Sequence, residues 1–207
     1  MTHALNDSPP AIDWAWAGAA LVSGESGDLH VVEALPHGAL IAVIDGLGHG
    51  PEAAVASREA AAILRAHAAL PVRDLFGLCH QGLRKTRGAV MTLASLDTRS
   101  STIDCCGVGN VEGVLFRASV SVRQAREVIS TRGGVVGDRL PPLKVSTLSV
   151  SPGEILVLAT DGIRVDFADA VDLESEPQVI APRVLARHAK DSDDALVLVA
   201  RYLGGPT

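Results

Sequence analysis

Four aspartates stand where apolar strands are expected to begin or end. Asp28 opens one apolar run, Asp45 and Asp161 each close one, and Asp193 precedes the last run of the chain. Carboxylates at strand ends are well placed to converge at the edge of a sheet. Oxygen ligands of this kind suit hard divalent cations, magnesium or manganese, better than zinc. The pattern therefore indicates a metal site built from carboxylates.

Asp45 and Asp161 are each followed directly by glycine. Glycine permits a tight turn and leaves a backbone carbonyl open as an additional oxygen ligand. Asp-Gly is also a common turn dipeptide, so either pair taken alone indicates only a turn. The apolar strand expected before each aspartate favours the metal-site interpretation.

The segment 45–50, Asp-Gly-Leu-Gly-His-Gly, places three glycines, an acid and a histidine between an expected strand and an expected helix. A phosphate-binding loop is one interpretation, because glycines let backbone N–H groups approach an anion. The segment lacks the patterns of a P-loop and of a dinucleotide-binding turn. A metal-carboxylate turn fits better, since the aspartate comes first. His49 is a candidate acid or base near neutral pH, or a residue that only orders the loop.

Apolar runs and turn signals predict the elements that must position these residues. The expected strands are 14–22, 29–35, 40–44, 90–96, 102–108, 111–116, 128–131, 147–150, 155–160 and 195–202, and the expected helices are 51–70, 72–85 and 182–189. Strands and helices do not alternate, which disfavours a doubly wound parallel sheet. We therefore expect an α+β domain with antiparallel sheets.

Composition narrows the class of protein. The chain has 207 residues, 47% of them hydrophobic and 20% charged, with a net charge of -6. These values fit one domain with a well-developed core and exclude a disordered or collagen-like chain. An acidic chain without a basic run is a poor nucleic-acid binder. No apolar run approaches the roughly 18 residues of a membrane span, and residues 1–10 do not resemble a signal peptide, so we expect a cytoplasmic protein.

Two further groups of residues are assigned to the core. The three cysteines, Cys79, Cys105 and Cys106, are expected to be reduced and buried. Trp14 and Trp16 lie on one face of the first expected strand, and we expect that face to be core rather than a binding platform.

Three stretches of the sequence occur in the order seen in the metal-dependent serine/threonine phosphatases of the PPM superfamily. They are the segment 45–50, Leu-Ala-Thr-Asp-Gly at 158–162 and Asp-Asp-Ala-Leu-Val at 193–197, and the first resembles the SpoIIE-like branch. Stretches 86–91, 107–111 and 133–137 further resemble the short, single-domain RsbX phosphatases, which act on stressosome proteins. The resemblance extends over about residues 14 to 202.

This resemblance implies a fold. We expect a four-layer αββα sandwich, in which two antiparallel β-sheets are flanked by helix pairs, with two manganese or magnesium ions at one edge. The phosphatase domain would span 13–203, after a flexible N-terminus over 1–12 and before a short tail over 204–207. We expect a monomer.

The resemblance also implies roles for the acidic residues. Asp45 would bridge both ions, the Gly46 carbonyl would bind one of them, and Asp161 and Asp193 would hold the other. Asp28 would act through metal-bound water or by direct ligation. The candidate catalytic residues are Asp45, Asp28 and His49, and the candidate metal ligands are Asp28, Asp45, Gly46, Asp161 and Asp193.

Several positions depart from the family pattern or leave a choice open. Many relatives have a histidine directly after Asp-Gly, where this chain has Leu47, and His49 two residues later is the remaining candidate general acid. Asp194 competes with Asp193 as the ligand. No arginine stands just upstream of Asp28, so phosphate binding would fall mostly to the metal ions. Arg87 and Arg164 are conceivable helpers, although an exposed surface arginine is the more ordinary interpretation of each.

These expectations combine into a hypothesis of function. The protein would hydrolyse phosphoserine or phosphothreonine on STAS-domain proteins of a stressosome or a related partner-switching module, through a water activated by two metal ions. A catalytically silent phosphoprotein-binding module of the same fold is the first alternative. A nucleotide-binding regulator that uses residues 46–50 as an anion loop is the second.

Overall fold

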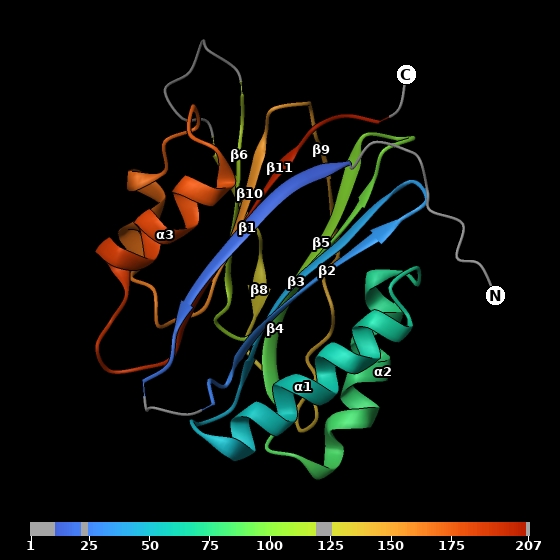
Figure 1. The fold of residues 1–207 in the computed structure, drawn as a ribbon. Helices are drawn as coiled ribbons and strands as arrows, with labels where there is room; N and C mark the ends of the chain where they lie inside the picture. Colours follow the sequence, from blue (N-terminus) through green and yellow to red (C-terminus); the bar gives the residue numbers. More distant parts are fainter. Residues whose placement is uncertain (1–10, 22–24, 119–125, 206–207) are drawn as a thin grey trace, which may run out of the picture.

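Two β-sheets stack face to face and carry helices on their outer sides in the computed structural model, which describes residues 11–21, 25–118 and 126–205 (Figure 1). The strands are β1 Ile12–Ala19, β2 Asp28–Leu35, β3 Gly38–Gly46, β4 Ala89–Asp97, β5 Thr102–Val108, β6 Glu112–Phe116, β7 Arg126–Val128, β8 Thr131–Arg132, β9 Ser146–Ser149, β10 Ile155–Ala159 and β11 Ala195–Tyr202. The α-helices are α1 Pro51–Ala66, α2 Val72–Gly82 and α3 Pro177–His188, and short 3-10 segments cover Leu83–Lys85 and Val165–Ala170.

The two sheets are assembled from strands far apart in the sequence. The first sheet has the order β1-β11-β10-β6-β7, and the second has the order β2-β3-β4-β5-β8, with β9 also paired to β5. The pairings are antiparallel except for the short β5–β8 pair, which is parallel. Helices α1 and α2 cover the second sheet, and α3 covers the first (Figure 1).

Strand β3 shows how the core sets the position of the functional residues. Both of its faces are buried, so its sequence is an almost continuous run of apolar residues. Leu40 and Ile44 pack beneath α1 and α2, whereas Ile41 and Val43 pack between the two sheets. Because side chains alternate along a strand, Asp45 continues the series of residues that point between the sheets.

The predicted fold class is confirmed, and the differences concern individual elements. The expected strand 128–131 divides into β7, which pairs with β6 in the first sheet, and β8, which pairs with β5 in the second. Ile129 is buried between them, where the chain crosses from one sheet to the other. The α3 helix begins at Pro177, before the expected start at 182, because a proline fits the first helical turn.

The outer side of the first sheet also differs from expectation. In the part of the chain that the structure describes, this side carries α3 and the 3-10 segment Val165–Ala170 instead of two α-helices. Phe167 and Ala168 of that segment are buried in the same apolar cluster as α3. The short segment therefore completes the fourth layer without forming a full helix.

The expectation that Trp14 and Trp16 belong to the core is wrong. Their exposed fractions are 37% and 49%. Both lie on the edge strand β1, and their ring centroids are 5.7 and 4.6 Å from that of His30 on the opposite edge strand, β2. The rings face the layer between the sheets, as the alternation predicts, but they close its open side and remain half in contact with solvent.

The other assignments to the core hold. All three cysteines are free and buried.

Two predicted features lie outside the described residues. They are residues 1–10, which contain most of the expected flexible N-terminus, and residues 22–24, just upstream of Asp28. Among the described helices, none is long and apolar enough to cross a membrane.

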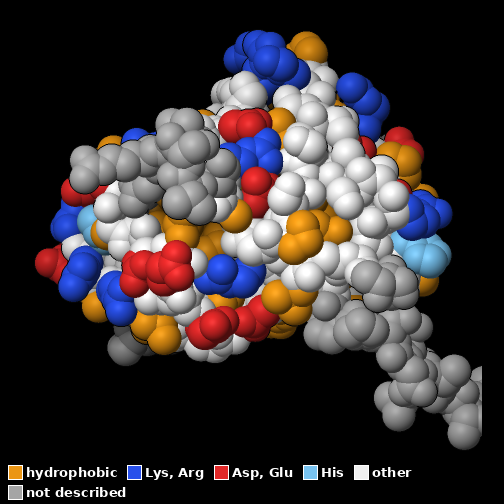
Figure 2. Space-filling model, turned by 90° about the horizontal axis from the view of Figure 1, so that it is seen from above, with side chains coloured by type: hydrophobic (Ala, Val, Ile, Leu, Met, Phe, Trp, Pro, Cys, Tyr) orange, Lys and Arg blue, Asp and Glu red, His pale blue; other side chains and the backbone are white. Residues whose placement is uncertain are grey.

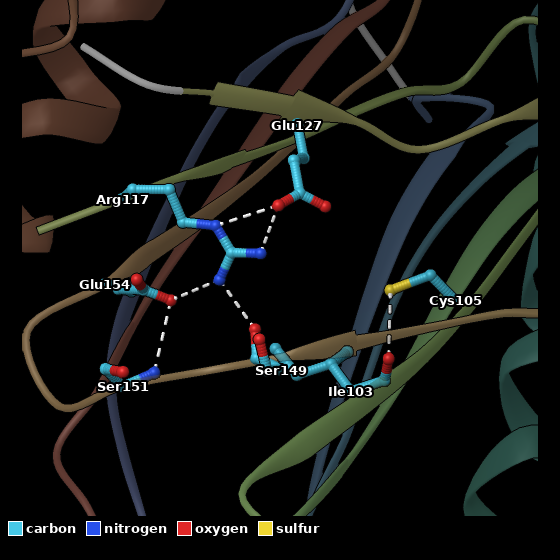
Figure 3. A network of polar contacts seen from close by, with 7 residues as sticks. All are labelled: Ile103, Cys105, Arg117, Glu127, Ser149, Ser151 and Glu154. Carbon is cyan, nitrogen blue, oxygen red and sulfur yellow. Dashed lines mark hydrogen bonds and ion pairs between the residues drawn. The ribbon is translucent and has the colours of Figure 1, made fainter. Parts of the chain in front are cut away.

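The end of the sandwich opposite to the α1 start is closed by a polar network. Arg117, which follows β6, donates to the carboxylates of Glu127 and Glu154 and to the Ser149 carbonyl, and Glu154 also accepts the Ser151 N–H (Figure 3). Seen from above, this end of the molecule shows basic and acidic side chains interspersed rather than gathered by sign (Figure 2). The network joins strands of both sheets, far from the residues expected to do chemistry.

Candidate metal centre

The β2–β3 pair places the first two aspartates side by side. Asp28 lies directly opposite Asp45 in the antiparallel register, and opposed residues point to the same face of a sheet. Asp28 is only 6% exposed, and its carboxylate accepts a 2.7 Å hydrogen bond from the Thr160 hydroxyl at the end of β10. This contact joins the two sheets at the site.

Close packing against α1 fixes the turn after Asp45. A Cβ on Gly46 would lie 2.1 Å from the Ala53 carbonyl oxygen, so only glycine fits there. The Gly46 N–H donates to the Gly27 carbonyl at 3.1 Å, and the Leu47 N–H donates to the Gly88 carbonyl at 3.0 Å. The glycine therefore lets the first turn of α1 lie directly against the end of β3.

The other two aspartates come from the first sheet. Asp161 follows β10, and Asp193 precedes the neighbouring strand β11. A Cβ on Gly162 would lie 1.8 Å from the Asp194 carbonyl oxygen, so this glycine lets the two loops cross in contact. Asp161 is held by a 2.7 Å hydrogen bond from the Asn110 amide, and its backbone carbonyl accepts a hydrogen bond from the Lys190 ammonium.

The geometry separates the roles of Asp193 and Asp194. The Asp194 carboxylate is 5% exposed, and its two oxygens accept the backbone N–H groups of Leu21 at 2.7 Å and Gly27 at 2.6 Å. These bonds tie the segments that precede β2 and β11 together. Asp193 lines the cavity described below, and its described hydrogen bond is a local one from the Asp194 N–H. The arrangement favours Asp193 as the residue open to a ligand.

Strand ends and loops from both sheets line an open cavity of about 670 Å³. Asp45, Asp161 and Asp193 line it together with His49. Asp28 lies beside Asp45 and lines a neighbouring cavity of about 370 Å³. The structure thus brings the four predicted aspartates to one end of the interface between the sheets, although they arise from both sheets.

Residues that the sequence reasoning gave no role also line the cavity. Asn110, Gly133, Gly134 and Ser192 contribute to its wall. Asn110 and the glycine pair belong to stretches that were noticed only for their resemblance to known phosphatases. Their Gly-Asn and Gly-Gly dipeptides are turn signals, which identify loops but not the cavity that those loops surround.

Burial and like charges raise the pKa values of the aspartates. Burial raises the pKa of Asp45 from 3.8 to about 8, and the carboxylates of Asp28, Asp161 and Asp193 add to this effect. Burial likewise raises the pKa of Asp28 to about 7, against the opposing effect of the Thr160 hydrogen bond. These groups favour protonation unless positive charge is brought to them.

The donor set fits a hard divalent cation. It consists of carboxylate oxygens with an adjacent Asp-Gly carbonyl, which suits magnesium or manganese. As the side chains stand in the described residues, no three His, Cys, Asp or Glu form a group ready to hold an ion. A cation at the cavity would offset the burial and the like-charge repulsion that raise the pKa values of Asp45 and Asp28.

The remaining sequence candidates lie at different distances from the cavity. His49 is exposed and lines it, and Leu47 also lines it while packing against the apolar cluster between the sheets. Arg164 contacts the Arg187 carbonyl and Asp166 and does not line the cavity. Arg87 lies against Gly48 at the rim of the cavity.

The chain has relatives both in sequence and in structure. Residues 36–203 match the family model described as Stage II sporulation protein E (SpoIIE). Phosphoserine phosphatase RsbX of Bacillus subtilis (strain 168) is 24% identical over 139 residues, which cover 67% of this chain and 68% of RsbX.

Solved structures are similar over nearly the whole chain. A crystal structure of RsbX in complex with magnesium has a TM-score of 0.81 at 21% identity and covers 96% of this chain and 98% of that one. A structure described as "The bacterial stressosome: a modular system that has been adapted to control secondary messenger signaling" has a TM-score of 0.83 at 27% identity and covers 92% of this chain and 99% of that one.

Proposed function

The chain belongs to the SpoIIE family of PP2C-type phosphatases, and from this membership we propose that it is a metal-dependent protein serine/threonine phosphatase. One observation carries the proposal. Asp45 of the second sheet and Asp161 and Asp193 of the first sheet line one cavity, with Asp28 directly beside Asp45. Such a set of oxygen donors is suited to divalent ions and to phosphoryl transfer to water.

The residues that we propose as ligands of two manganese or magnesium ions are those that the resemblance to the PPM phosphatases implies. Asp45, the Gly46 carbonyl, Asp161 and Asp193 would hold the ions. Asp28, which shares the face of Asp45, would bind through water or directly. When bound, the ions would supply an activated water and neutralise the phosphoryl oxygens.

Other residues would orient these ligands and handle the proton. Asn110 and Lys190 hold the side chain and backbone of Asp161, and the Thr160 hydroxyl holds Asp28. His49 projects from an exposed loop that lines the cavity, where it could donate a proton to the departing serine or threonine oxygen. Catalysis requires no cysteine nucleophile, and burial raises the pKa of the Cys79 and Cys105 thiols to about 12.

The substrate class rests on the relatives. RsbX is a phosphoserine phosphatase, and the other structural relative is described in terms of the bacterial stressosome. We therefore propose that the substrates are phosphorylated STAS-domain proteins of a stressosome or a related partner-switching module, and that the reaction takes place in the cytoplasm.

The test is phosphate release from a phosphothreonine-bearing STAS protein, with and without manganese. We expect release that requires manganese and is lost in Asp45→Asn. A matched control is Asp169→Asn, because Asp169 is 74% exposed and pairs with Arg126 away from the cavity. Manganese binding without release from the wild-type chain would contradict the proposal and indicate the catalytically silent binding module.

A further inference from the structure

Arg87 is held beside the cavity by its two neighbours in the chain. The Thr86 hydroxyl donates to the Leu83 carbonyl at 2.8 Å and accepts the Gly88 N–H at 3.0 Å. The Gly88 carbonyl in turn accepts the N–H of Leu47, two residues after Asp45. Gly88 adopts a φ of 80°, which a residue with a side chain rarely takes. The backbone on both sides of Arg87 is therefore tied to the turn that carries Asp45.

The Arg87 side chain extends along the rim of the cavity. A Cβ on Gly48 would lie 2.6 Å from Arg87 Nη1, so the guanidinium lies directly against the backbone of this cavity-lining residue. Its other nitrogen, Nη2, forms an ion pair with Glu52 in the first turn of α1. The two side chains are 52% and 68% exposed, so the pair is open to solvent and to a ligand.

The charge around the cavity explains what such an arginine could do. Asp28, Asp45, Asp161 and Asp193 carry four negative charges when ionised, and two divalent ions would only balance them. A phosphoryl group that enters adds further negative charge. A guanidinium presents N–H donors in a planar fork that matches two phosphate oxygens, and it remains charged at every relevant pH.

We propose that Arg87 binds the phosphoryl group of the substrate, exchanging Glu52 for it as the phosphoprotein docks. The inference rests on the proposed phosphatase function. An exposed ion pair contributes little stability, so Glu52 can hold the guanidinium at the rim without preventing the exchange. Arg87 is thus a substrate-binding residue, and the pairing with Glu52 prepares its position.

The test compares Arg87→Ala, Arg87→Lys and Arg65→Ala with the wild-type chain. Arg65 is a matched control, because it is 51% exposed and pairs with Glu33 on the β2 side of α1, away from the cavity. Steady-state hydrolysis of a phosphothreonine peptide with manganese gives kcat and KM, and inorganic phosphate as product inhibitor gives an inhibition constant. Thermal unfolding checks that all variants fold.

For Arg87→Ala we expect KM and the phosphate inhibition constant to rise roughly tenfold or more, the usual effect of losing a charge-assisted hydrogen bond. The change in kcat should be small, because the interaction exists in both the bound substrate and the transition state. The KM and the inhibition constant of Arg87→Lys should lie between those of the wild-type chain and those of Arg87→Ala. Lysine keeps the positive charge but lacks the planar pair of N–H donors. Changes in KM and in the inhibition constant no larger than those of Arg65→Ala would overturn the proposal.

A binding measurement separates this inference from the phosphatase proposal. Fluorescence anisotropy with a labelled phosphothreonine peptide and manganese reports affinity even in a chain that does not turn over. Weaker peptide binding by Arg87→Ala supports the role of Arg87 whether or not the wild-type chain releases phosphate. Equal peptide binding by the two chains would refute it, even where phosphate release is observed.

Discussion

Asp45→Asn should stabilise the metal-free protein although it abolishes the proposed activity. The pKa of Asp45 is raised from 3.8 to about 8 in the folded chain. Between these two values the unfolded chain is ionised at this residue while the folded chain retains the proton. The stability of the folded state therefore falls as pH rises from 3.8, and it stops falling above about 8.

The size of this effect follows from the difference between the pH of the solution and the pKa of Asp45 in the unfolded chain. At about 1.4 kcal/mol per pH unit, the ionisation of Asp45 lowers the free energy of unfolding by about 4 kcal/mol at pH 7 and by about 2 kcal/mol at pH 5. Asp45 is partly exposed, and solvent screening lowers both values. We expect Asp45→Asn to raise the free energy of unfolding by about 2–4 kcal/mol at pH 7 and by about 1 kcal/mol at pH 5.

Urea unfolding in the presence of a chelator, at both pH values, measures this difference. Asp194→Asn is the control, because both oxygens of Asp194 accept backbone N–H groups and an amide can accept only one of them. It should destabilise the chain by about 1–3 kcal/mol. Added manganese should stabilise the wild-type chain and have less effect on Asp45→Asn. The reasoning fails if Asp45→Asn is no more stable than wild type at pH 7, or if its advantage does not shrink at pH 5.

Two further predictions test the positions of other site residues. Gly162→Ala would place a Cβ 1.8 Å from the Asp194 carbonyl oxygen. We therefore expect a loss of more than about 3 kcal/mol in the free energy of unfolding. An unchanged urea midpoint would contradict the contact between the loop after β10 and the loop before β11. His49→Ala should lower kcat for a phosphothreonine peptide by roughly 100-fold but change it little for p-nitrophenyl phosphate, whose leaving group needs no proton. An equal loss of kcat on the two substrates would indicate that His49 only orders the loop and does not donate a proton.

Local patterns in the sequence predict much of this fold. The apolar run of β3 and the alanine-rich sequence of α1 predict a strand and a helix, and the expected strand ends pointed to the four aspartates of the candidate site. The exposure of Trp14 and Trp16 could not be predicted, because alternation gives the face of a strand but not its place in the sheet. Whether a strand is an edge strand depends on pairings between residues far apart in the chain.

The sequence could not decide between Asp193 and Asp194 for a related reason. Two adjacent aspartates in one loop are equivalent in composition, and only their partners distinguish them. The partners of Asp194 are the N–H groups of Leu21 and Gly27, more than 160 residues away in the chain. No local pattern encodes a contact over that separation.

The interface between the sheets links stability to function. The same alternation that buries Ile41 and Val43 between the sheets carries Asp45 to the end of that layer, opposite Asp28 and against the loops of Asp161 and Asp193. An apolar residue at position 45 would extend the core and relieve the repulsion among the carboxylates, so the acid there works against the stability of the metal-free fold. A divalent cation bound by these carboxylates would reverse the sign of that effect, because it favours their ionised form. We therefore expect metal affinity to rise with pH over the same range in which the metal-free fold loses stability, because both reflect the ionisation of the same few aspartates.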